Sequence, residues 1–439
     1  MKTVLALTAA LVSLAWGWDV LVVGTPPGAT LWVIRQEALY LTGLLSIALM
    51  SLAMFLSTRP AWLEGPLGGL DRVYRTHRWA GILAGVFALT HWLVEMSGDL
   101  IKALIGRSGR IPKETLGGFL EALRHLAKDL GEWAIWVLLA MLLITLWRRF
   151  PYAIWRVLHR VMPLLYLALA LHAVMLAPPA YWTQPAGVVL AALIAAGVYG
   201  SVLSLAGRIG RSLQVTGKIV SVSRISPEVV GVSCQLDERW PGHRPGQFAF
   251  VRFAHGDGQH PFTIASADHG NRQVRFEIKA LGDFTRRLGE RLAAGQPVSV
   301  EGPYGRFELR RRKPGARQIW IAGGIGVTPF LAWLESLTDR PAEAPAADLH
   351  YCTRDGDADP FVDRLQSLCA ALPQIRLSIH DARAGQTLTA GELAASEPTA
   401  RSAEVWFCGP QGLADALRAG LARAWRGRLR FHQEAFALR

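Results

Sequence analysis

Long apolar runs fill the first half of the chain, and short alternating stretches fill the second half. Six runs are long enough to cross a bilayer as helices: residues 3–23, 36–56, 78–97, 132–148, 153–177 and 186–206. The first run has a signal peptide as its alternative, but it is long for one and shows no A-x-A cleavage site. We therefore expect an all-α membrane domain of six helices over residues 1–211.

Residues 212–312 alternate between apolar and polar positions, with turn residues between the stretches. The expected strands are QVTGKIVSVSRI, VVGVSCQL, QFAFVRF, RFEIKAL and QPVSVEGPYG, which predict a small antiparallel β-barrel. From residue 313 on, the strands QIWIAG, ADLHYCTR, IRLSIH and EVWFCG alternate with the helical stretches TPFLAWLESL, FVDRLQSLCAAL and GLADALRAGLARAW. This βαβ pattern predicts an α/β domain around a parallel sheet at 313–439.

Two of the apolar runs carry histidines at regular spacing. His77, just before the third run, and His91, within it, lie 14 residues apart, and His159 and His172 lie 13 residues apart in the fifth. An imidazole in lipid is costly unless it binds something, so the four side chains suggest two bis-histidine haem sites. At about 1.5 Å per residue, the two layers would lie roughly 20 Å apart, one near each membrane face.

Helical phase is an objection to the second pair. At about 100° per residue, 14 residues return to nearly the same helix face, whereas 13 residues miss it by well over a third of a turn. Pro163 lies between His159 and His172 and could bend or rewind that helix. The alternative for all four histidines is a packed core role, with each ring donating to a backbone carbonyl.

Arginines at the ends of the runs set the expected orientation. The cytoplasmic turns carry Arg59, Arg72, Arg75 and Arg78, then Arg148, Arg149, Arg156 and Arg160, then Arg208 and Arg211. The basic loop 98–131 then lies outside, where residues 114–133 are expected to form an amphipathic surface helix with His125 in solvent. Arg35, at the outer end of the second run, could hold a haem propionate, attract an anion or snorkel.

The cysteines, Cys234, Cys352, Cys369 and Cys408, all lie in the second half, and no C-x-x-C occurs. Zinc knuckles, iron–sulfur signatures and covalent haem attachment are therefore excluded, and a reduced cytoplasmic module is expected. The net charge of +13 suits lipid headgroups and phosphate ligands. No basic tract interleaved with aromatic residues points to nucleic acid, and no obligatory protein partner is indicated.

A glycine-rich turn, Ala322 to Pro329, follows the strand QIWIAG. Positions without side chains let backbone N–H groups approach a pyrophosphate, and the following helix N-terminus adds a favourable dipole. Tight packing of strand and helix would also explain the glycines. The order of barrel, glycine turn and Cys-Gly-Pro strand end is more specific than the turn alone.

With these features together, the chain resembles a bacterial member of the ferric reductase and NADPH oxidase superfamily, a flavocytochrome b, over nearly its whole length. That family carries histidine pairs at spacings of 14 and 13 and binds two b-type haems, so the resemblance implies iron ligation by His77, His91, His159 and His172. The second half resembles the ferredoxin–NADP reductase fold. It implies an FAD-binding barrel at 212–312 and an NADPH-binding domain at 313–439.

The resemblance also implies the flavin residues. HPFTIAS, from His260 to Ser266, matches the HPFT-x-x-S motif, in which Phe262 packs on the flavin and Thr263 bonds near its N5 atom. Arg244 to Phe248 and Gly302 to Gly305 match the framing turns of the family. The residues expected at FAD are His260, Pro261, Phe262, Thr263, Ser266, Lys279, Gly282, Asp283, Phe284 and Thr285.

The nucleotide residues follow from the same match. They are Gly323, Gly324, Gly326, Val327, Thr328 and Pro329 in the turn, and Cys408, Gly409 and Pro410 beside the nicotinamide. Phe436 matches the aromatic residue that stacks on the flavin, although three residues follow it here. Arg354 stands where relatives bind the 2′-phosphate, so NADPH is expected, with NADH as the alternative. Thr263, Cys408 and Phe436 are the expected catalytic residues.

The resemblance implies electron transfer from cytoplasmic NADPH through FAD and two haems to an external acceptor. O2, giving superoxide, is the expected acceptor, and a ferric chelate or another external acceptor is the alternative. Glu95 stands four residues after His91, where animal oxidases carry a histidine, so the oxygen chemistry is less firmly implied than the electron transfer. A metal or ion transporter with a regulatory nucleotide domain is a third hypothesis, which the complete flavin motif disfavours.

Overall fold

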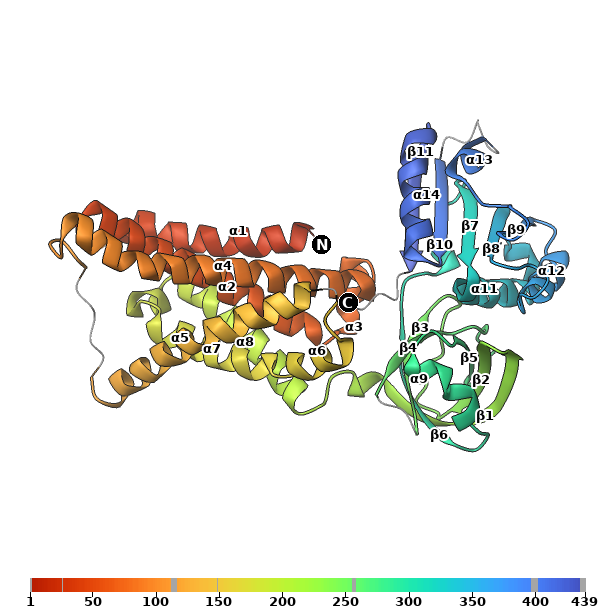
Figure 1. Cartoon of the computed structure of the whole chain (residues 1–439), viewed down its shortest axis with the longest axis horizontal. Helices are drawn as coiled ribbons and strands as arrows, with labels where there is room; N and C mark the ends of the chain where they lie inside the picture. Colours follow the sequence, from red (N-terminus) through yellow and green to blue (C-terminus); the bar gives the residue numbers. More distant parts are fainter. Residues whose placement is uncertain are drawn as a thin grey trace. The chain divides into compact units, whose positions relative to one another are not determined.

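The computed structural model describes residues 2–25, 27–111, 117–147, 149–254, 258–395 and 402–434. The chain divides into two compact units, Met1–Ile209 and Gly210–Arg439. The first unit consists of helices and the second contains two β-sheets (Figure 1). Each unit has its own hydrophobic core.

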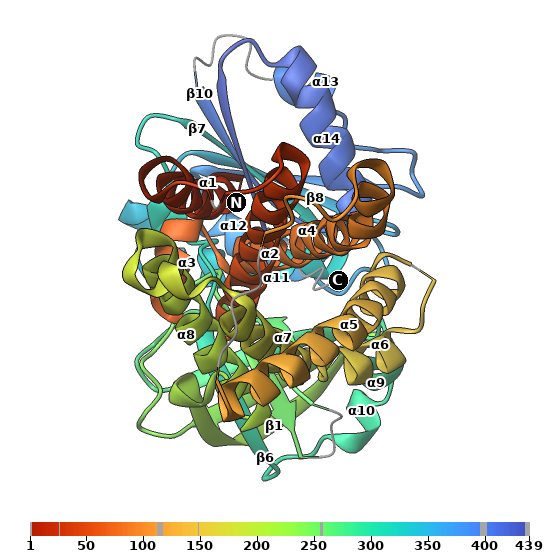
Figure 2. The same cartoon turned by 90° about the vertical axis from the view of Figure 1, so that its left-hand side faces the viewer.

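Unit 1 is a bundle around one central helix. Its helices are α1 (Lys2–Trp18), α2 (Thr30–Ser57), α3 (Ala61–Leu67), α4 (Leu70–Ile105), α5 (Phe119–Leu146), α6 (Tyr152–His159), α7 (Met162–Leu176) and α8 (Pro185–Leu205). The helices α1, α4, α7 and α8 all pack against α2 (Figure 2). Six helical segments of the described chain are long and apolar enough to cross a membrane, which confirms the predicted number of spans.

Large apolar side chains face outward on this bundle. Leu14, Leu21 and Trp133 are 73%, 86% and 75% exposed, and many other leucines, valines and tryptophans of unit 1 share this exposure. In water, apolar surface on this scale would drive association, whereas acyl chains solvate it without loss. The unit is therefore built to lie in a bilayer.

Helix α5 corrects one prediction. A single helix runs through Phe119–Leu146, where the sequence suggested a surface helix over 114–133 and a separate span after it. Ala127, Ala134 and Leu138 are buried on one stripe that continues through both parts. His125 stays exposed, 3.4 Å from Glu121. The prediction of a separate helix was wrong because small residues extend the apolar stripe beneath the charged face.

A break between α6 and α7 answers the objection about helical phase. Arg160 N donates to Val157 O at 3.2 Å and Val161 N to Leu158 O at 3.0 Å, both bonds of a 3₁₀ turn. A 3₁₀ turn advances about 120° per residue, against about 100° in an α-helix. Pro163 has no N–H to offer the carbonyl four residues earlier. The two arms can therefore present their histidines on one side despite the 13-residue spacing.

Unit 2 begins with an antiparallel barrel. Its strands are β1 (Gln214–Ser226), β2 (Val229–Leu236), β3 (Phe248–Phe253), β4 (His260–Thr263), β5 (Gln273–Lys279) and β6 (Pro297–Tyr304), in the order β4-β3-β6-β1-β2-β5. A bridge between Ile264 and Phe276 joins the two edge strands and closes the barrel. The predicted barrel is confirmed, except that the HPFT stretch was not expected to be a strand.

A five-stranded parallel sheet completes unit 2, in the order β11-β10-β7-β8-β9. Its strands are β7 (Arg317–Gly323), β8 (Ala347–Thr353), β9 (Ile375–Asp381), β10 (Ser402–Cys408) and β11 (Arg428–Glu434). Helices α11 (Thr328–Thr338) and α12 (Val362–Ala370) cover one face, and α13 (Ala390–Ala395) and α14 (Gln411–Ala424) the other. The predicted α/β fold is confirmed, and β11 is an edge strand that the sequence analysis missed.

Candidate functional site

The four histidines of unit 1 meet in two pairs. The ring centroids of His77 and His159 lie 6.2 Å apart with planes at 75°, and those of His91 and His172 lie 6.4 Å apart with planes at 84°. This pairing requires α4 and the α6–α7 arm to run in the same direction. These are the pairs that the spacing suggested.

Backbone carbonyls orient three of these rings. His77 Nδ1 lies 2.8 Å from Ala53 O, His91 Nδ1 3.0 Å from Leu39 O, and His172 Nδ1 2.9 Å from Ala127 O. An Nδ1–H that donates to a carbonyl fixes the tautomer and leaves Nε2 with a free lone pair. These carbonyl contacts are the feature that a core role also predicted, so they do not separate the two hypotheses.

The ring separations are compatible with both hypotheses. Two imidazoles that bind one metal through nitrogen at about 2.0–2.1 Å would have ring centroids about 6.4 Å apart, and edge-to-face packing of two rings gives about 4.5–7 Å. The observed separations, 6.2 and 6.4 Å, fall in both ranges. The residues present therefore fit two bis-histidine haem sites.

Small residues make room for the rings. A Cβ at Gly131 would lie 2.2 Å from His172 Nδ1, and a Cβ at Gly43 would lie 3.2 Å from His91 Nδ1. Gly81 lies between His77 and His91 along α4, and a Cβ there would meet no heavy atom within 4 Å. The sequence analysis missed these glycines, because neither a turn nor a motif marks them.

His159 is held differently from the other three. Its ring stacks on Trp155 with centroids 4.8 Å apart and planes at 23°. Its Nδ1 is buried and has no hydrogen-bond partner in the described part of the chain. Trp155 is anchored in turn by a bond from its Nε1 to Thr145 Oγ1 at 3.0 Å. Stacking thus replaces the carbonyl contact as the means of orientation.

Arg35 and Glu95 form an ion pair one helical turn beyond His91. The Arg35 guanidinium contacts the Glu95 carboxylate at 2.6 Å and its backbone carbonyl at 2.8 Å. The arginine side chain is 11% exposed and the glutamate 51%. Snorkelling, one of the alternatives for Arg35, does not describe this buried and paired side chain.

The expected flavin motif forms the edge of the barrel. β4 places His260 to Thr263 beside β3, and the His260 ring stacks on Phe284 with centroids 4.0 Å apart. Ser266 Oγ accepts from Arg275 N at 3.2 Å, and Ser266 O lies 3.0 Å from His243 Nε2. The end of the motif is therefore fixed by hydrogen bonds that the sequence analysis did not anticipate.

The second flavin segment forms a tight turn before α9 (Asp283–Arg286). Thr285 Oγ1 accepts from the backbone N–H groups of Leu281 and Gly282, both at 2.9 Å. Lys279 lies 3.4 Å from Glu228, so its ammonium has a carboxylate partner here. The hydroxyl of Thr285 serves the loop backbone, and a direct role at a pyrophosphate stays a prediction.

One framing turn requires glycine. Gly246 has φ of +92°, and a Cβ there would lie 1.9 Å from Phe307 O and 2.5 Å from Trp333 Nε1. The Trp333 indole donates to Pro245 O at 3.0 Å. The turn thus packs against helix α11, which follows the nucleotide turn. A Cβ at Gly305, in the other framing turn, would lie 3.1 Å from Glu434 Oε1. The end of β11 therefore approaches the barrel just after β6.

The glycine turn and the Cys-Gly-Pro segment pack backbone against backbone. A Cβ at Gly326 would lie 2.3 Å from Cys408 O, and a Cβ at Gly323 would lie 2.7 Å from Pro410 Cδ. Gly324 has φ of +54°, and a Cβ there would meet open space. The structure therefore brings together the two segments expected at the nucleotide. Burial raises the pKa of the Cys408 thiol well above its ordinary value, with the Glu434 carboxylate adding to the effect, so the thiol stays protonated.

Arg354 lies exposed just beyond β8, and no ion pair of its side chain occurs in the described part of the chain. Its neighbour Asp355 pairs with Arg383. Asp359 accepts from Tyr351 Oη and from Thr353 Oγ1 at 2.6 Å, which holds the loop after β8 in place. Phe436 lies outside the described residues.

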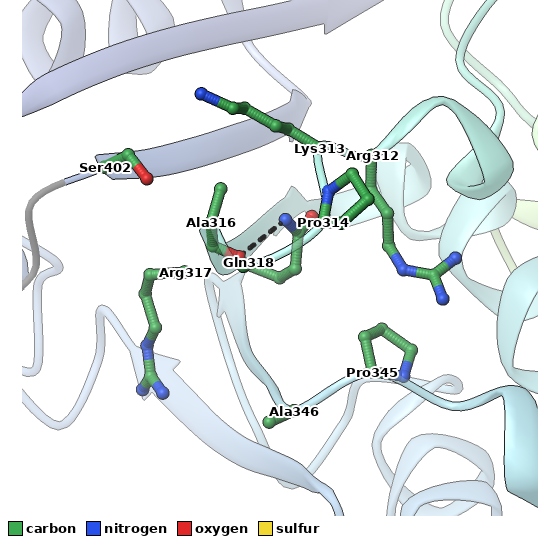
Figure 3. A pocket seen from close by; sticks show the side chains of 10 residues that line it. Arg312, Lys313, Pro314, Ala316, Arg317, Gln318, Pro345, Ala346 and Ser402 are labelled. Atoms are coloured by element: carbon green, nitrogen blue, oxygen red, sulfur yellow. Dashed lines mark hydrogen bonds between the residues drawn. The ribbon is translucent and has the colours of Figure 1, made fainter.

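A cavity of about 450 Å³ lies at the opposite end of the parallel sheet, where β7, β8 and β10 begin. Its lining includes Arg312, Lys313 and Arg317. Figure 3 shows that these three side chains point in different directions, and Arg317 is paired with Asp348. The cavity is distant from the glycine turn and presents no convergent cation cluster.

Two family models match the chain. One, described as "Ferric reductase like transmembrane component", matches residues 42–170, which include His77, His91 and His159. The other, described as "FAD-binding domain", matches residues 214–308. Together the two matches give the chain a ferric reductase/NADPH oxidase-like architecture. It combines a multi-pass membrane unit with a barrel that matches the FAD-binding domain and a five-stranded parallel sheet.

Curated relatives match the chain in part. The carnitine monooxygenase reductase subunit of Escherichia coli (strain K12) is 30% identical over 207 residues, covering 45% of this chain and 60% of the relative. The heme-dependent oxidative N-demethylase beta subunit of Ectopseudomonas mendocina (strain ymp) is 30% identical over 202 residues, with the same two coverages. The chain thus spans about 60% of the length of these relatives.

Solved structures show weaker similarity. A flavohemoglobin from Malassezia yamatoensis aligns with 93% of this chain and 100% of its own, at 17% identity and a TM-score of 0.49. A ferredoxin NADP+ reductase from Neisseria gonorrhoeae aligns with 50% of this chain and 98% of its own, at 17% identity and a TM-score of 0.42. The architecture rests on the family matches and on the chain's own sheets and helices.

Proposed function

We propose that the protein moves electrons from cytoplasmic NADPH, through FAD and two b-type haems, to an acceptor on the other side of the membrane. The observation that carries this proposal is the pair of histidine contacts in unit 1, at ring separations of 6.2 and 6.4 Å. A redox module built only for soluble partners would have no use for paired imidazoles inside apolar helices. The family matches to a membrane component and an FAD-binding domain support the same reading.

The chemistry belongs to the bound groups, since FAD accepts hydride and passes single electrons and haem carries single electrons across lipid. The protein supplies position. His77 and His159 would hold the inner haem, and His91 and His172 the outer one. The backbone carbonyls of Ala53, Leu39 and Ala127 accept from Nδ1 of three of these rings, which would leave Nε2 free to bind a metal.

In unit 2, Phe262 and Thr263 on β4 would contact the flavin, and the glycine turn and Cys408, which pack against each other, would hold the nicotinamide. Holding two reactants at contact distance is the main contribution that a protein makes to hydride transfer. The protonated Cys408 thiol serves as a neutral group beside the nicotinamide. Phe436 is proposed, as in the family, to cover the flavin until the nucleotide binds.

Arg354 is the proposed partner of the 2′-phosphate, because its guanidinium is exposed beyond β8 and arginine binds phosphate in a bidentate manner. NADPH is therefore proposed over NADH. The neighbouring Asp355–Arg383 ion pair adds a carboxylate close to this position.

Oxygen is the proposed acceptor, with superoxide as product, and a ferric chelate is the second candidate. Glu95 favours the second candidate, because a carboxylate near the outer histidines is a hard ligand for iron. Arg35 forms an ion pair with that carboxylate at 2.6 Å, which opposes metal binding there. Oxygen therefore remains the first candidate acceptor.

The test is anaerobic addition of NADPH to detergent-solubilised, FAD-loaded protein while the haem Soret and α bands are recorded. Haem reduction, followed in air by rapid reoxidation with superoxide dismutase-sensitive superoxide, is the expected result. Slow reoxidation in air with fast reoxidation by ferric chelate would transfer the assignment to a metal reductase. A folded protein without a haem spectrum would refute the role of the four histidines.

The control variant is His159→Ala. It should remove the inner haem and stop reduction of the outer one, while NADPH still drives reduction of ferricyanide through the flavin. Loss of the dye reaction as well would mean that the variant is misfolded, and the spectral result would then be taken from His77→Ala.

A further inference from the structure

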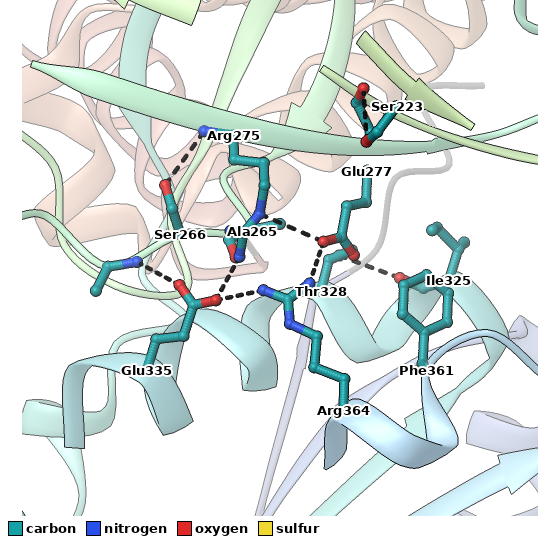
Figure 4. A network of polar contacts seen from close by, with 12 residues as sticks. Ser223, Ala265, Ser266, Arg275, Glu277, Ile325, Thr328, Glu335, Phe361 and Arg364 are labelled. Carbon is teal, nitrogen blue, oxygen red and sulfur yellow. Dashed lines mark hydrogen bonds and ion pairs between the residues drawn. The ribbon is translucent and has the colours of Figure 1, made fainter. Parts of the chain in front are cut away.

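Four charged side chains form a closed ring in unit 2. Arg275 and Glu277 come from β5 of the barrel, Glu335 from α11 and Arg364 from α12. Each arginine contacts both carboxylates: Arg275 with Glu277 at 3.4 Å and with Glu335, and Arg364 with Glu277 and with Glu335. Figure 4 shows the alternation of positive and negative groups. The ring joins the barrel to the nucleotide-binding sheet.

The ring is largely withdrawn from solvent. The Glu277 side chain is 0% exposed and Glu335 19%, while Arg275 and Arg364 are 31% and 29% exposed. Burial raises the pKa of Glu335, but Arg275 and Arg364 together outweigh it and hold the pKa below its ordinary value. Two positive and two negative charges make the set neutral, and each charge has two opposite neighbours. Removing one member would leave an opposite charge buried without one of its partners, which is strongly destabilising.

The ring holds the end of the flavin motif. An Arg275 guanidinium nitrogen donates to Ala265 O at 3.0 Å, and its backbone N–H donates to Ser266 Oγ at 3.2 Å. The backbone N–H of Ala267 donates to Glu335 Oε2 at 3.3 Å. The last residues of HPFTIAS and the residue after them are thus bonded both to β5 and to a helix of the other domain.

The same ring holds the elements that carry the nucleotide residues. Helix α11 begins at Thr328, directly after the glycine turn, and Glu335 lies two turns into it. Helix α12 begins at Val362, after the loop that carries Arg354, and Arg364 lies in its first turn. A shift of either helix relative to β5 must break at least one of the four contacts.

We propose that Arg275, Glu277, Glu335 and Arg364 are positioning residues that set the distance between nicotinamide and flavin for hydride transfer. The proposal rests on the proposed function, in which a hydride with its two electrons leaves the nicotinamide and is accepted by the flavin. The four side chains touch neither reactant. They fix the strand that carries one site against the helices that carry the other, and a displacement of about 1 Å is enough to slow such a step about a hundredfold.

The test compares full-length, FAD-loaded protein with three variants. Glu277→Gln with Arg364→Met removes one positive and one negative charge together, so the remaining Arg275–Glu335 pair stays balanced. Arg364→Lys keeps the charge but loses the planar fork that reaches two carboxylates. Arg340→Met is the matched control, since Arg340 lies two residues after the end of α11 and pairs with Glu343 at 3.4 Å on the surface, where both side chains are mostly exposed.

Two readouts are recorded: the rate of anaerobic flavin reduction with its deuterium isotope effect from nicotinamide-deuterated NADPH, and hydrogen exchange of residues 265–267 without nucleotide. In the double variant we expect the rate to fall at least tenfold, the isotope effect to rise and exchange at 265–267 to accelerate at least fivefold. The FAD content of the double variant should match wild type. Both readouts of the Arg340→Met control should also match wild type. A wild-type rate and isotope effect in the double variant would overturn the proposal.

The Arg364→Lys variant decides the matter if the double variant does not fold. A reduced rate with wild-type thermal unfolding supports positioning, and a wild-type rate refutes it. Should wild-type protein itself fail to be reduced by NADPH or NADH, the proposed function fails. The exchange comparison needs no turnover and still tests the ring in that case.

Discussion

At the scale of single residues, a helix that packs against a proposed haem ligand is as constrained in sequence as the ligand itself. Gly131→Ala should reduce the haem content from two per chain toward one, because the added methyl group would lie 2.2 Å from His172 Nδ1. Alanine stabilises a helix by about 1 kcal/mol relative to glycine, so the loss would not come from a weaker α5. The haem-to-protein ratio from a pyridine haemochrome assay measures the effect.

Gly17→Ala in α1 is the matched control for this substitution, because a Cβ at Gly17 meets no heavy atom within 4 Å. Full haem content in both variants would contradict the position of His172 against α5.

Thiol chemistry supplies a second prediction at this scale. Burial raises the pKa of the Cys234 thiol from 9.0 to about 12. A folded-state pKa above the unfolded value means that the stabilising contribution is complete below pH 9 and is lost as the pH rises through about 12. Iodoacetamide at pH 8.5 should therefore leave Cys234 unmodified in native protein and modify it readily in urea, as read by peptide mass spectrometry. Rapid native modification would contradict the burial.

The histidine pairs could be predicted because their chemistry appears in the residue type and its spacing. The partners that orient them could not. Ala53, Leu39 and Ala127 contribute only a carbonyl, which every residue possesses, so no letter of the sequence marks them. The same holds for the ring of charges around Glu335, whose members come from three separate elements.

At the scale of elements, the turn between α6 and α7 sets the phase of the fifth span. Pro163→Ala would restore a donor for the carbonyl of His159 and favour a continuous α-helix. A 13-residue α-helix leaves the two rings about 140° apart, so one of them should leave its partner. We expect loss of about one haem per chain and a single α-band potential in a redox titration.

Pro185→Ala is the control for this prediction. Both prolines lie in the first turn of a helix, but Pro185 follows the extended residue Gln184, whereas Pro163 comes two residues after the helical residue Val161, so only Pro163 can interrupt a continuous helix. Two resolved potentials in the Pro163→Ala protein would show that the proline does not set the phase.

Element prediction failed where tertiary contacts decide. The HPFT stretch is a strand only because β3 pairs with it, and β11 is an edge strand with alternate polar residues that pairs with β10. Helix α5 continues through a charged stretch because one face packs into the bundle. Long apolar runs and the βαβ alternation were predicted correctly, since their patterns are set by burial on every turn or strand.

At the scale of the whole molecule, the electron path has a direction only if the two ends of the bundle face different compartments. Nicotinamide nucleotides are intracellular, so unit 2 must be cytoplasmic for the proposed function. The arginines flanking the turns after α2 and before α6 agree with this orientation under the positive-inside rule, whereas Arg107 and Arg110 in the loop after α4 oppose it. Charge alone therefore leaves a conflict that an accessibility experiment resolves.

Single cysteines introduced at two exposed serines give that experiment. Ser108 lies in the loop after α4, and Ser212 follows α8. In intact cells, a membrane-impermeant maleimide should label Ser108→Cys, and it should label Ser212→Cys only after permeabilisation. Three of the four native cysteines are buried and the fourth is partly buried, so they should react only slowly with the maleimide. Replacing all four removes that slow background labelling. The reverse pattern would place the nucleotide-binding sheet outside, where no NADPH reaches it, and would refute the proposed direction of electron flow.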